Sequence, residues 1–223
     1  MTLTSSKIKF RDIVVSSQAI AGSPLMDPEA LTRIALDAIV GGAGAIRLAG
    51  ADTVAFASKR IGVPIIGLIK TNRIGYEPRI TATSEEIHQL KEAGAQIVAI
   101  DATHRKRPEA LESLFQTAVS NKLEIFADIA NLEEAKQSMD LGATYVATTM
   151  SGYTDARMPT EGPDFELLKG VIALGAKAVL EGRVSTAAHI QKALDLGAHS
   201  VVIGRAITSP QTILRGILEG VKK

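Results

Sequence analysis

Eight short apolar runs recur along the chain, separated by longer stretches in which apolar and polar residues alternate with helical spacing. Each run is continuous and rich in Val and Ile instead of alternating between apolar and polar positions. This pattern is typical of parallel strands that are buried on both faces. It predicts strands over residues 13–18, 45–48, 64–70, 96–101, 124–128, 145–149, 177–181 and 200–204.

The stretches between these runs carry the signals that start and end helices. The segments 27–29, 83–86 and 131–134 each offer an N-cap residue, with proline or acidic residues in the first turn. Five segments place glycine just past a helix and alanine before the next strand: GGAGAIR, EAGAQIV, DLGATYV, ALGAKAV and DLGAHSV. Glycine in that position ends a helix in the left-handed conformation, so the sequence repeats a helix–glycine–strand unit.

Eight strands alternating with about eight helices fit a (β/α)₈ barrel better than an open doubly wound sheet, which usually has five or six strands. Hydrophobic residues make up 46% of the 223 residues but aromatic residues only 4%, so Ala, Val, Ile and Leu must fill the core. No linker rich in Pro, Gly or Ser divides the chain. We therefore predict an α/β fold, a TIM barrel, as one domain over residues 1–223.

The net charge and the numbers of cysteine and histidine residues argue against several classes of function. A net charge of +1 gives no field that would attract nucleic acid or an anionic membrane. The basic run 104–107 is either a solvated loop or a small polyanion patch. Zero cysteines, and four histidines without H-x-x-x-H spacing, argue against a zinc site. No apolar leader or membrane-length run is present, so we expect a cytoplasmic protein that acts on a small molecule without a metal.

In a (β/α)₈ barrel the active site lies at the carboxyl ends of the strands. The predicted ends carry polar groups suited to an anionic, hydroxyl-rich ligand such as a sugar phosphate. These residues are Gln18, Arg47, Lys70, Asp101, Asp128, Thr148, Thr149, Glu181, Gly204 and Arg205. A structural interpretation stays open for four of them. Arg47 could pair with a neighbouring carboxylate, Asp101 and Asp128 could cap the loops that follow, and Gln18 has a similar structural alternative.

Lys70 and Glu181 are harder to explain by structure alone. Lys70 ends the apolar run PIIGLIK, and Glu181 ends the seventh predicted strand. Either the two side chains form a simple ion pair, or they act as a base and an acid. The second interpretation is chemically sound, because burial can lower the pKa of a lysine to about 7–8 and raise that of a glutamic acid to about 6–7.

Two glycine-bearing turns, EGRVST and IGRAITSP, follow the seventh and eighth predicted strands. Barrels commonly bind phosphate there, because backbone N–H groups and a helix N-terminus point outward. We expect Gly182, Arg183, Gly204 and Arg205 to bind phosphate. The alternative is that both glycines only form turns.

The loop after the sixth predicted strand, TTMSGYTDARMPTEGPDFELL, is long for this chain. Loops of this length in compact domains often cover a ligand, although a plain surface excursion is the other interpretation. Thr149 and Tyr153 are its candidate substrate contacts.

Motifs along residues 13–207 resemble the N-acylglucosamine-6-phosphate 2-epimerases, which are the N-acetylmannosamine-6-phosphate epimerases of sialic acid breakdown. The motifs are IVVSSQA, GGAGAIRLAG, PIIGLIKTN, AIDATHRKRP, ADIANLEEA, ATTMSGYT and EGRVST. The resemblance implies a cofactor-free, metal-independent enzyme, usually a homodimer. It would invert C2 of N-acetylmannosamine 6-phosphate to give N-acetylglucosamine 6-phosphate.

The resemblance also implies roles for particular residues. Lys70 and Glu181 match the family's essential lysine and glutamate, while Gln18, Arg47 and Asp128 match its substrate contacts. Arg205 stands where a small residue is more usual. From the residues alone, a Schiff-base lyase using the same lysine and a sugar-phosphate sensor without catalysis stay open as other functions.

Overall fold

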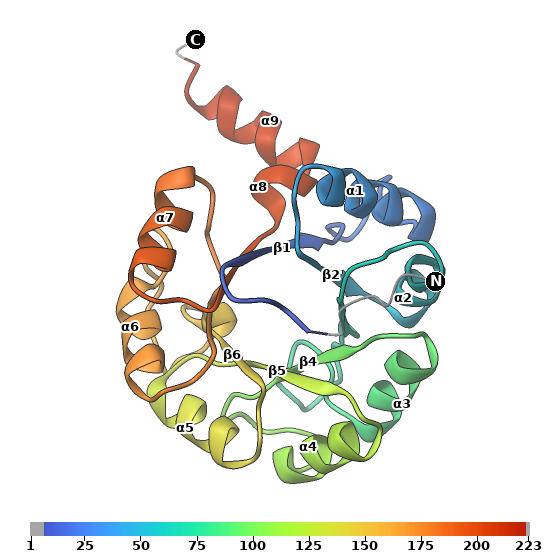
Figure 1. The fold of residues 1–223 in the computed structure, drawn as a ribbon, viewed down its shortest axis with the longest axis vertical. Helices are drawn as coiled ribbons and strands as arrows, with labels where there is room; N and C mark the ends of the chain where they lie inside the picture. Colours follow the sequence, from blue (N-terminus) through green and yellow to red (C-terminus); the bar gives the residue numbers. More distant parts are fainter. Residues whose placement is uncertain (1–6, 222–223) are drawn as a thin grey trace.

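Each of the eight predicted runs forms a strand in the computed structural model, which describes residues 7–221. The strands are β1 (Asp12–Ser17), β2 (Ala45–Ala49), β3 (Ile65–Leu68), β4 (Ile97–Asp101), β5 (Glu124–Asp128), β6 (Tyr145–Ala147), β7 (Ala178–Leu180) and β8 (Ser200–Ile203). Neighbouring strands pair in parallel in chain order, and β8 pairs back with β1, so the sheet closes (Figure 1). The predicted (β/α)₈ barrel is confirmed. Residues 1–6 and 222–223 of the predicted domain lie outside the described residues.

β1, β7 and β8 end one residue earlier than predicted, and β3 and β6 end two residues earlier; the last two differences shape the barrel mouth. β3 stops at Leu68 because the chain leaves the parallel sheet and Lys70 pairs in an antiparallel bridge with Ile80. β6 stops at Ala147, after which the 3₁₀ turn η1 (Thr148–Met150) replaces the last predicted strand residues.

Within residues 7–221, seven helices surround the barrel and two more follow β8. They are α1 (Pro28–Val40), α2 (Ala51–Ser58), α3 (Ser84–Glu92), α4 (Leu111–Ser120), α5 (Leu132–Asp140), α6 (Phe165–Ala173), α7 (Ala187–Asp195), α8 (Arg205–Thr208) and α9 (Pro210–Glu219). Figure 1 shows α1 to α7 around the outside of the sheet, whereas α9 points away from it. None of the helices within residues 7–221 is both long and apolar enough to cross a lipid bilayer.

The helix boundaries follow the predicted signals. Asp27 and Asn131 each accept a hydrogen bond from a backbone N–H of the first turn, and Thr83 forms a reciprocal capping box with Glu86. The glycines of the five repeated exits have positive φ angles: Gly42 (105°), Gly94 (97°), Gly142 (97°), Gly175 (83°) and Gly197 (99°). The left-handed conformation that the repeat predicts is therefore present at every one of these exits.

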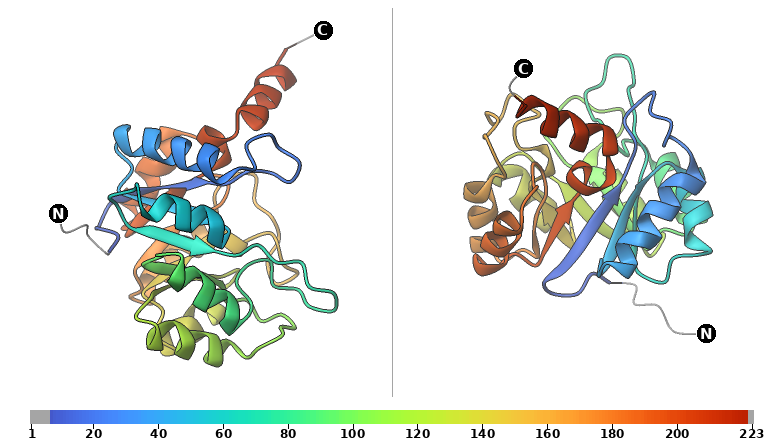
Figure 2. Two further views of the ribbon diagram at one scale, coloured as in Figure 1. Left: turned by 90° about the vertical axis from the view of Figure 1, so that its right-hand side faces the viewer. Right: turned by 90° about the horizontal axis from the view of Figure 1, so that it is seen from above.

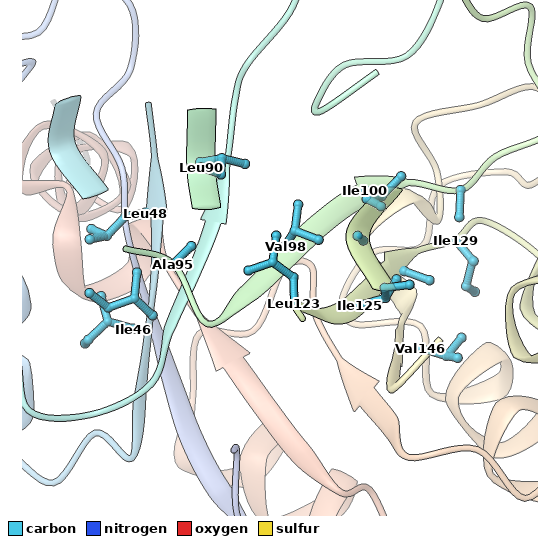
Figure 3. Close-up of a cluster of buried hydrophobic side chains, with 14 of the residues drawn as sticks. Ile46, Leu48, Leu90, Ala95, Val98, Ile100, Leu123, Ile125, Ile129 and Val146 are labelled. Carbon is cyan, nitrogen blue, oxygen red and sulfur yellow. The ribbon is translucent and has the colours of Figure 1, made fainter. Parts of the chain in front are cut away.

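The core has two layers, one inside the barrel and one between the sheet and the helices. Ile66 packs inside the barrel and its neighbour Ile65 packs outside, and both are at most 1% exposed. Figure 3 shows part of the outer layer, with side chains such as Ile46 and Val98 between strands and helices. Because successive residues of a strand point to opposite faces, burial on both sides explains why the apolar runs are continuous.

The amino end of the barrel is closed by side chains and by the segment before β1. Ile8 packs into the inner core, its N–H donates to the Tyr145 hydroxyl (3.1 Å), and its carbonyl oxygen lies 3.1 Å from His199 Nε2. The ring of Tyr145 lies 5.5 Å from that of His199. This packing stabilises the amino end and leaves the polar chemistry to the opposite, carboxyl end.

The last helix does not complete the outer ring. None of the residues of α9 is buried, and Figure 2 shows this helix extending away from the barrel. Ile213, Leu214, Ile217 and Leu218 on α9 are exposed. Where a helix would lie between α7 and α1, a cavity of about 430 Å³ opens instead. Its lining includes Ile13, Val15, Ile34, Ala38, Ile190 and Ile203.

Candidate active site

The strand register points Arg47 and Asp128 into the barrel. On β2, Ile46 and Leu48 pack against the helices, so Arg47 between them faces inward. On β5, Phe126 belongs to the inner core, so Asp128 two residues later faces inward as well. The Arg47 guanidinium lies 5.6 Å from the centre of the Phe126 ring. Both charged groups thus lie directly above the apolar interior.

Arg47 joins two carboxylates from different strands. Its Nη2 donates to Asp128 Oδ2 at 2.5 Å, and its Nη1 donates to Glu181 Oε1. Burial acts to lower the pKa of Arg47, but Asp128 and Glu181 raise it above the usual value, so the guanidinium stays charged. The structure therefore shows the carboxylate pairing that was one of the two interpretations of Arg47. Its Nε is buried without a hydrogen-bond partner among residues 7–221.

Thr149 joins the same two carboxylates on their other side. Its Oγ1 lies 2.6 Å from Asp128 Oδ1 and 3.1 Å from Glu181 Oε2. The neighbouring Thr148 hydroxyl contacts the backbone O and N of Glu181, at 2.9 and 3.1 Å, and holds the end of β7 in place. Because β6 ends early, the η1 turn places the hydroxyls of Thr148 and Thr149 against the ends of β5 and β7.

Asp128 is the most deeply buried acid of this cluster. Its side chain is fully buried, and burial raises its pKa to about 7, with Arg47 opposing and Glu181 adding to the increase. Asp128 does not cap α5, because Asn131 performs that role. The alternative interpretation of Asp128 as a cap is wrong.

Lys70 lies at the mouth just beyond β3. Its Nζ donates to the carbonyl oxygen of Ala19 at 3.2 Å. Lys70 is exposed at the mouth and not fully buried, but its partial desolvation still lowers its pKa below the usual value, and the positive charges of Arg47 and Arg205 lower it further. Within residues 7–221 no ion pair joins Lys70 to Glu181, whose carboxylate binds Arg47 instead, so the simple ion pair is not formed.

Asp101 has a structural role. It is fully buried and accepts hydrogen bonds from Thr103 N (3.2 Å), Arg79 N (2.9 Å) and Arg105 Nη2 (2.6 Å). These contacts hold the loops after β3 and β4 together, as the loop-capping interpretation predicts. Arg105, from the basic run, is therefore committed to this network and not to a polyanion.

Both glycine-bearing turns that were predicted to bind phosphate are present at the ends of β7 and β8. Gly182 has a φ angle of 108°, and Gly204 precedes α8, whose first residue is Arg205. The Arg183 guanidinium donates to the carbonyl oxygens of Gly162 (2.8 Å) and Ser151 (3.0 Å), so it anchors the loop after β6. The phosphate roles of these four residues stay predictions, and Arg183 reaches the ligand only if these bonds rearrange.

Two further predicted contacts lie at the rim. Gln18 follows β1 and its Nε2 donates to Ser16 Oγ at 2.9 Å. Tyr153 is 51% exposed, and the Arg183 guanidinium lies 5.9 Å from its ring centre. Their substrate contacts stay predictions. The Ala19 carbonyl could not be predicted as a contact of Lys70, because a backbone acceptor does not depend on residue type.

Known proteins match this chain over nearly its full length. A family model described as "Putative N-acetylmannosamine-6-phosphate epimerase" matches residues 31–223. The chain belongs to this family. A relative from Caldanaerobacter subterraneus subsp. tengcongensis is 39% identical over 95% of this chain and 91% of its own. One from Clostridioides difficile is 37% identical over 97% and 98%. Both are named "Putative N-acetylmannosamine-6-phosphate 2-epimerase".

A solved structure of the N-acetylmannosamine-6-phosphate 2-epimerase from Clostridium perfringens is similar in fold, with a TM-score of 0.93. It shares 36% sequence identity, and the match covers 96% of this chain and 95% of that one. The family resemblance expected from the motifs is confirmed. Among residues 7–221, the acids and histidines form no group of three or more that could hold a metal ion.

Proposed function

We propose that this protein is an N-acylglucosamine-6-phosphate 2-epimerase. It inverts C2 of N-acetylmannosamine 6-phosphate to give N-acetylglucosamine 6-phosphate, a step of sialic acid and amino sugar breakdown. The observation that carries the proposal is the combination of a lysine with a lowered pKa and an arginine-held carboxylate cluster at one barrel mouth, in a chain of this family. Lys70 provides the base and Glu181 the opposing acid.

Lys70 removes the C2 proton of the ring-opened sugar. That C–H bond lies next to the C1 aldehyde, so its electron pair forms an enolate whose negative charge rests on O1. Desolvation and the charges of Arg47 and Arg205 favour the neutral amine, which is the form that accepts a proton. Glu181 then delivers a proton to the opposite face of C2 and restores the neutral sugar with inverted configuration.

Arg47 stabilises the charge that develops during this step. Its two terminal nitrogens are committed to carboxylates, so its orientation is fixed before the substrate arrives. The buried Nε is the donor that remains for O1 or for the amide oxygen. Binding of the distant phosphate by Gly182, Gly204 and Arg205 would align C2 with the amine.

Proton NMR of N-acetylmannosamine 6-phosphate with the protein in D₂O tests the proposal, because it reports epimerisation and C2 exchange together. The wild-type protein should form N-acetylglucosamine 6-phosphate that carries deuterium at C2. Lys70→Ala should abolish both signals while phosphate-ligand binding is retained, and the exposed Lys59→Ala serves as the matched control. Full exchange in Lys70→Ala would refute the lysine as the base.

The proposal includes a homodimer without a resident cofactor. The apolar residues of α9 are exposed, and the apolar cavity between α7 and α1 is unfilled. In a dimer, α9 of each copy would pack into the cavity of the other. Sedimentation velocity should give a dimer for the wild-type protein. Leu214→Lys should shift it to the monomer, whereas Gln211→Lys on the same helix should not, and an unchanged dimer in Leu214→Lys would count against this contact.

We also propose a cytoplasmic location. A chain with zero cysteines does not depend on an oxidising compartment to fold. Cell fractionation with an antibody to the protein tests this part of the proposal.

A further inference from the structure

One hydroxyl group lies between two carboxyl oxygens at the centre of the site. Thr149 Oγ1 is within hydrogen-bond distance of Asp128 Oδ1 (2.6 Å) and of Glu181 Oε2 (3.1 Å). A threonine hydroxyl has a single hydrogen, so it can donate to only one of these oxygens at a time. The second contact is a hydrogen bond only if that carboxyl is protonated and donates to the threonine.

The other oxygens of the two carboxyl groups are bridged by Arg47, so four side chains form a closed ring. Arg47 Nη2 binds Asp128 Oδ2 and Arg47 Nη1 binds Glu181 Oε1. With both acids ionised, the ring has a net charge of about −1 and one unmatched contact at Thr149. With one added proton the ring is neutral and every contact has a donor. Burial favours the neutral state, since Asp128 is fully buried and Glu181 only 12% exposed.

We propose that Asp128 and Glu181 share one proton and that the Thr149 hydroxyl passes it between them. This inference rests on the proposed epimerase function and adds a source for the proton that Glu181 delivers. Asp128 holds the shared proton at rest. It gives this proton to Thr149 Oγ1 while the threonine hydrogen moves to Glu181 Oε2, and Glu181 then gives that proton to C2. One O–H bond breaks for each O–H or C–H bond that forms, and both acids are ionised once C2 is protonated.

The surroundings of Asp128 suit a proton store. The charged groups that act on it are Arg47 from β2, Glu181 just after β7 and Asp101 from β4, and Thr149 donates from η1. Its pKa of about 7 places the gain and loss of a proton near neutral pH. Lys70 is bound to the Ala19 carbonyl and is not a member of the ring, so the two proton sources of the site are separate.

Thr149→Val tests the relay, because valine keeps the shape of threonine but lacks the hydroxyl. With the epimer that Lys70 deprotonates, the variant should still exchange the C2 hydrogen for deuterium but should invert slowly, by about 10²-fold in rate. With the other epimer, exchange and inversion should both fall together. Thr149→Ser, which keeps the hydroxyl, should restore the wild-type ratio of exchange to inversion, and Thr117→Val on α4 should not change that ratio.

The outcomes separate this inference from the proposed function. A wild-type protein that inverts C2, together with a Thr149→Val variant whose exchange-to-inversion ratio is unchanged from both epimers, would overturn the relay and leave the epimerase intact. A wild-type protein that neither exchanges nor inverts would overturn both. Circular dichroism of Thr149→Val, compared with Thr149→Ser, shows whether a loss of activity comes from unfolding.

Infrared spectroscopy of the wild-type protein gives a second measurement that needs no turnover. A protonated carboxyl should be visible just below neutral pH and should be lost in Asp128→Asn, in which Glu181 alone remains to pair with Arg47. A wild-type spectrum in which all carboxyl groups are ionised at that pH would overturn the shared proton. Persistence of the protonated band in Asp128→Asn would also overturn it.

Discussion

Replacing Arg47 with methionine tests the charge cluster most directly, because methionine keeps much of the side-chain volume and removes the guanidinium that bridges the two acids. Arg47 is 3% exposed, and its partners Asp128 and Glu181 have side chains 0% and 12% exposed. Removing one partner of a buried ion pair typically costs about 3–5 kcal/mol, because the remaining charge is left uncompensated. For a chain of this size, that corresponds to a melting temperature lower by about 6–20 °C.

The loss should depend on pH in a defined direction. Arg47 is the group that lowers the pKa of Asp128 against the effect of burial, so Arg47→Met should raise that pKa further above about 7. A carboxyl whose pKa is higher in the folded than in the unfolded protein stabilises the fold fully below the unfolded pKa, and this contribution is lost as pH rises through the folded pKa. Arg47→Met should therefore be least destabilised near pH 5 and most destabilised near pH 8, about one unit above the wild-type pKa.

Urea unfolding followed by circular dichroism measures this free energy, at one fixed protein concentration because a dimer would make stability concentration-dependent. The matched control is Arg33→Met, which breaks an exposed pair with Glu29 (side chains 76% and 54% exposed) and should cost less than about 1 kcal/mol. Adding Asp128→Asn to Arg47→Met should recover about 1–3 kcal/mol. A loss no larger than that of Arg33→Met, or one that does not grow with pH, would refute the reasoning.

Two further predictions concern the base and the packing of β3. The kcat should rise with pH through the lowered pKa of Lys70, and Arg205→Met should move this limb to higher pH because it removes a positive charge near the amine; a limb that stays in place would contradict that. Gly67→Ala would place a Cβ 2.9 Å from Leu90 Cδ2, so unfolding in urea should show a loss of about 1–3 kcal/mol. Gly220→Ala, where the nearest atom is 3.5 Å away, should stay within about 0.5 kcal/mol, and equal losses would rule out overpacking.

Much of the site was accessible from the sequence because a closed parallel barrel brings all strand ends to one mouth. The polar ends at Arg47, Asp128 and Glu181 were expected near one another, and the structure joins them. Which of these side chains form ion pairs with one another was not predictable. The sequence suggested Lys70 as the partner of Glu181, but side-chain pairing depends on distances across the barrel, which strand order alone does not give.

The loops were the least predictable part. Arg183 lies in a glycine-bearing turn of the kind that binds phosphate, yet its guanidinium anchors the loop after β6. Asp101 was equally compatible with catalysis and with capping, and its contacts with Thr103 and Arg79 favour capping. In both cases the deciding groups come from loops, whose conformations depend on contacts distant in the sequence.

The sequence by itself determined the strands, the helix caps, the glycine exits and the residue types at the mouth, because each depends on local backbone preference and on the period of the apolar pattern. Only the tertiary structure decided which charges pair, where α9 lies and how Thr149 meets two acids. The Thr149 contacts arise because β6 ends at Ala147 and a 3₁₀ turn follows, so the hydroxyl lies between β5 and β7. Local preference cannot set such contacts, since they depend on how three strands meet in the closed barrel.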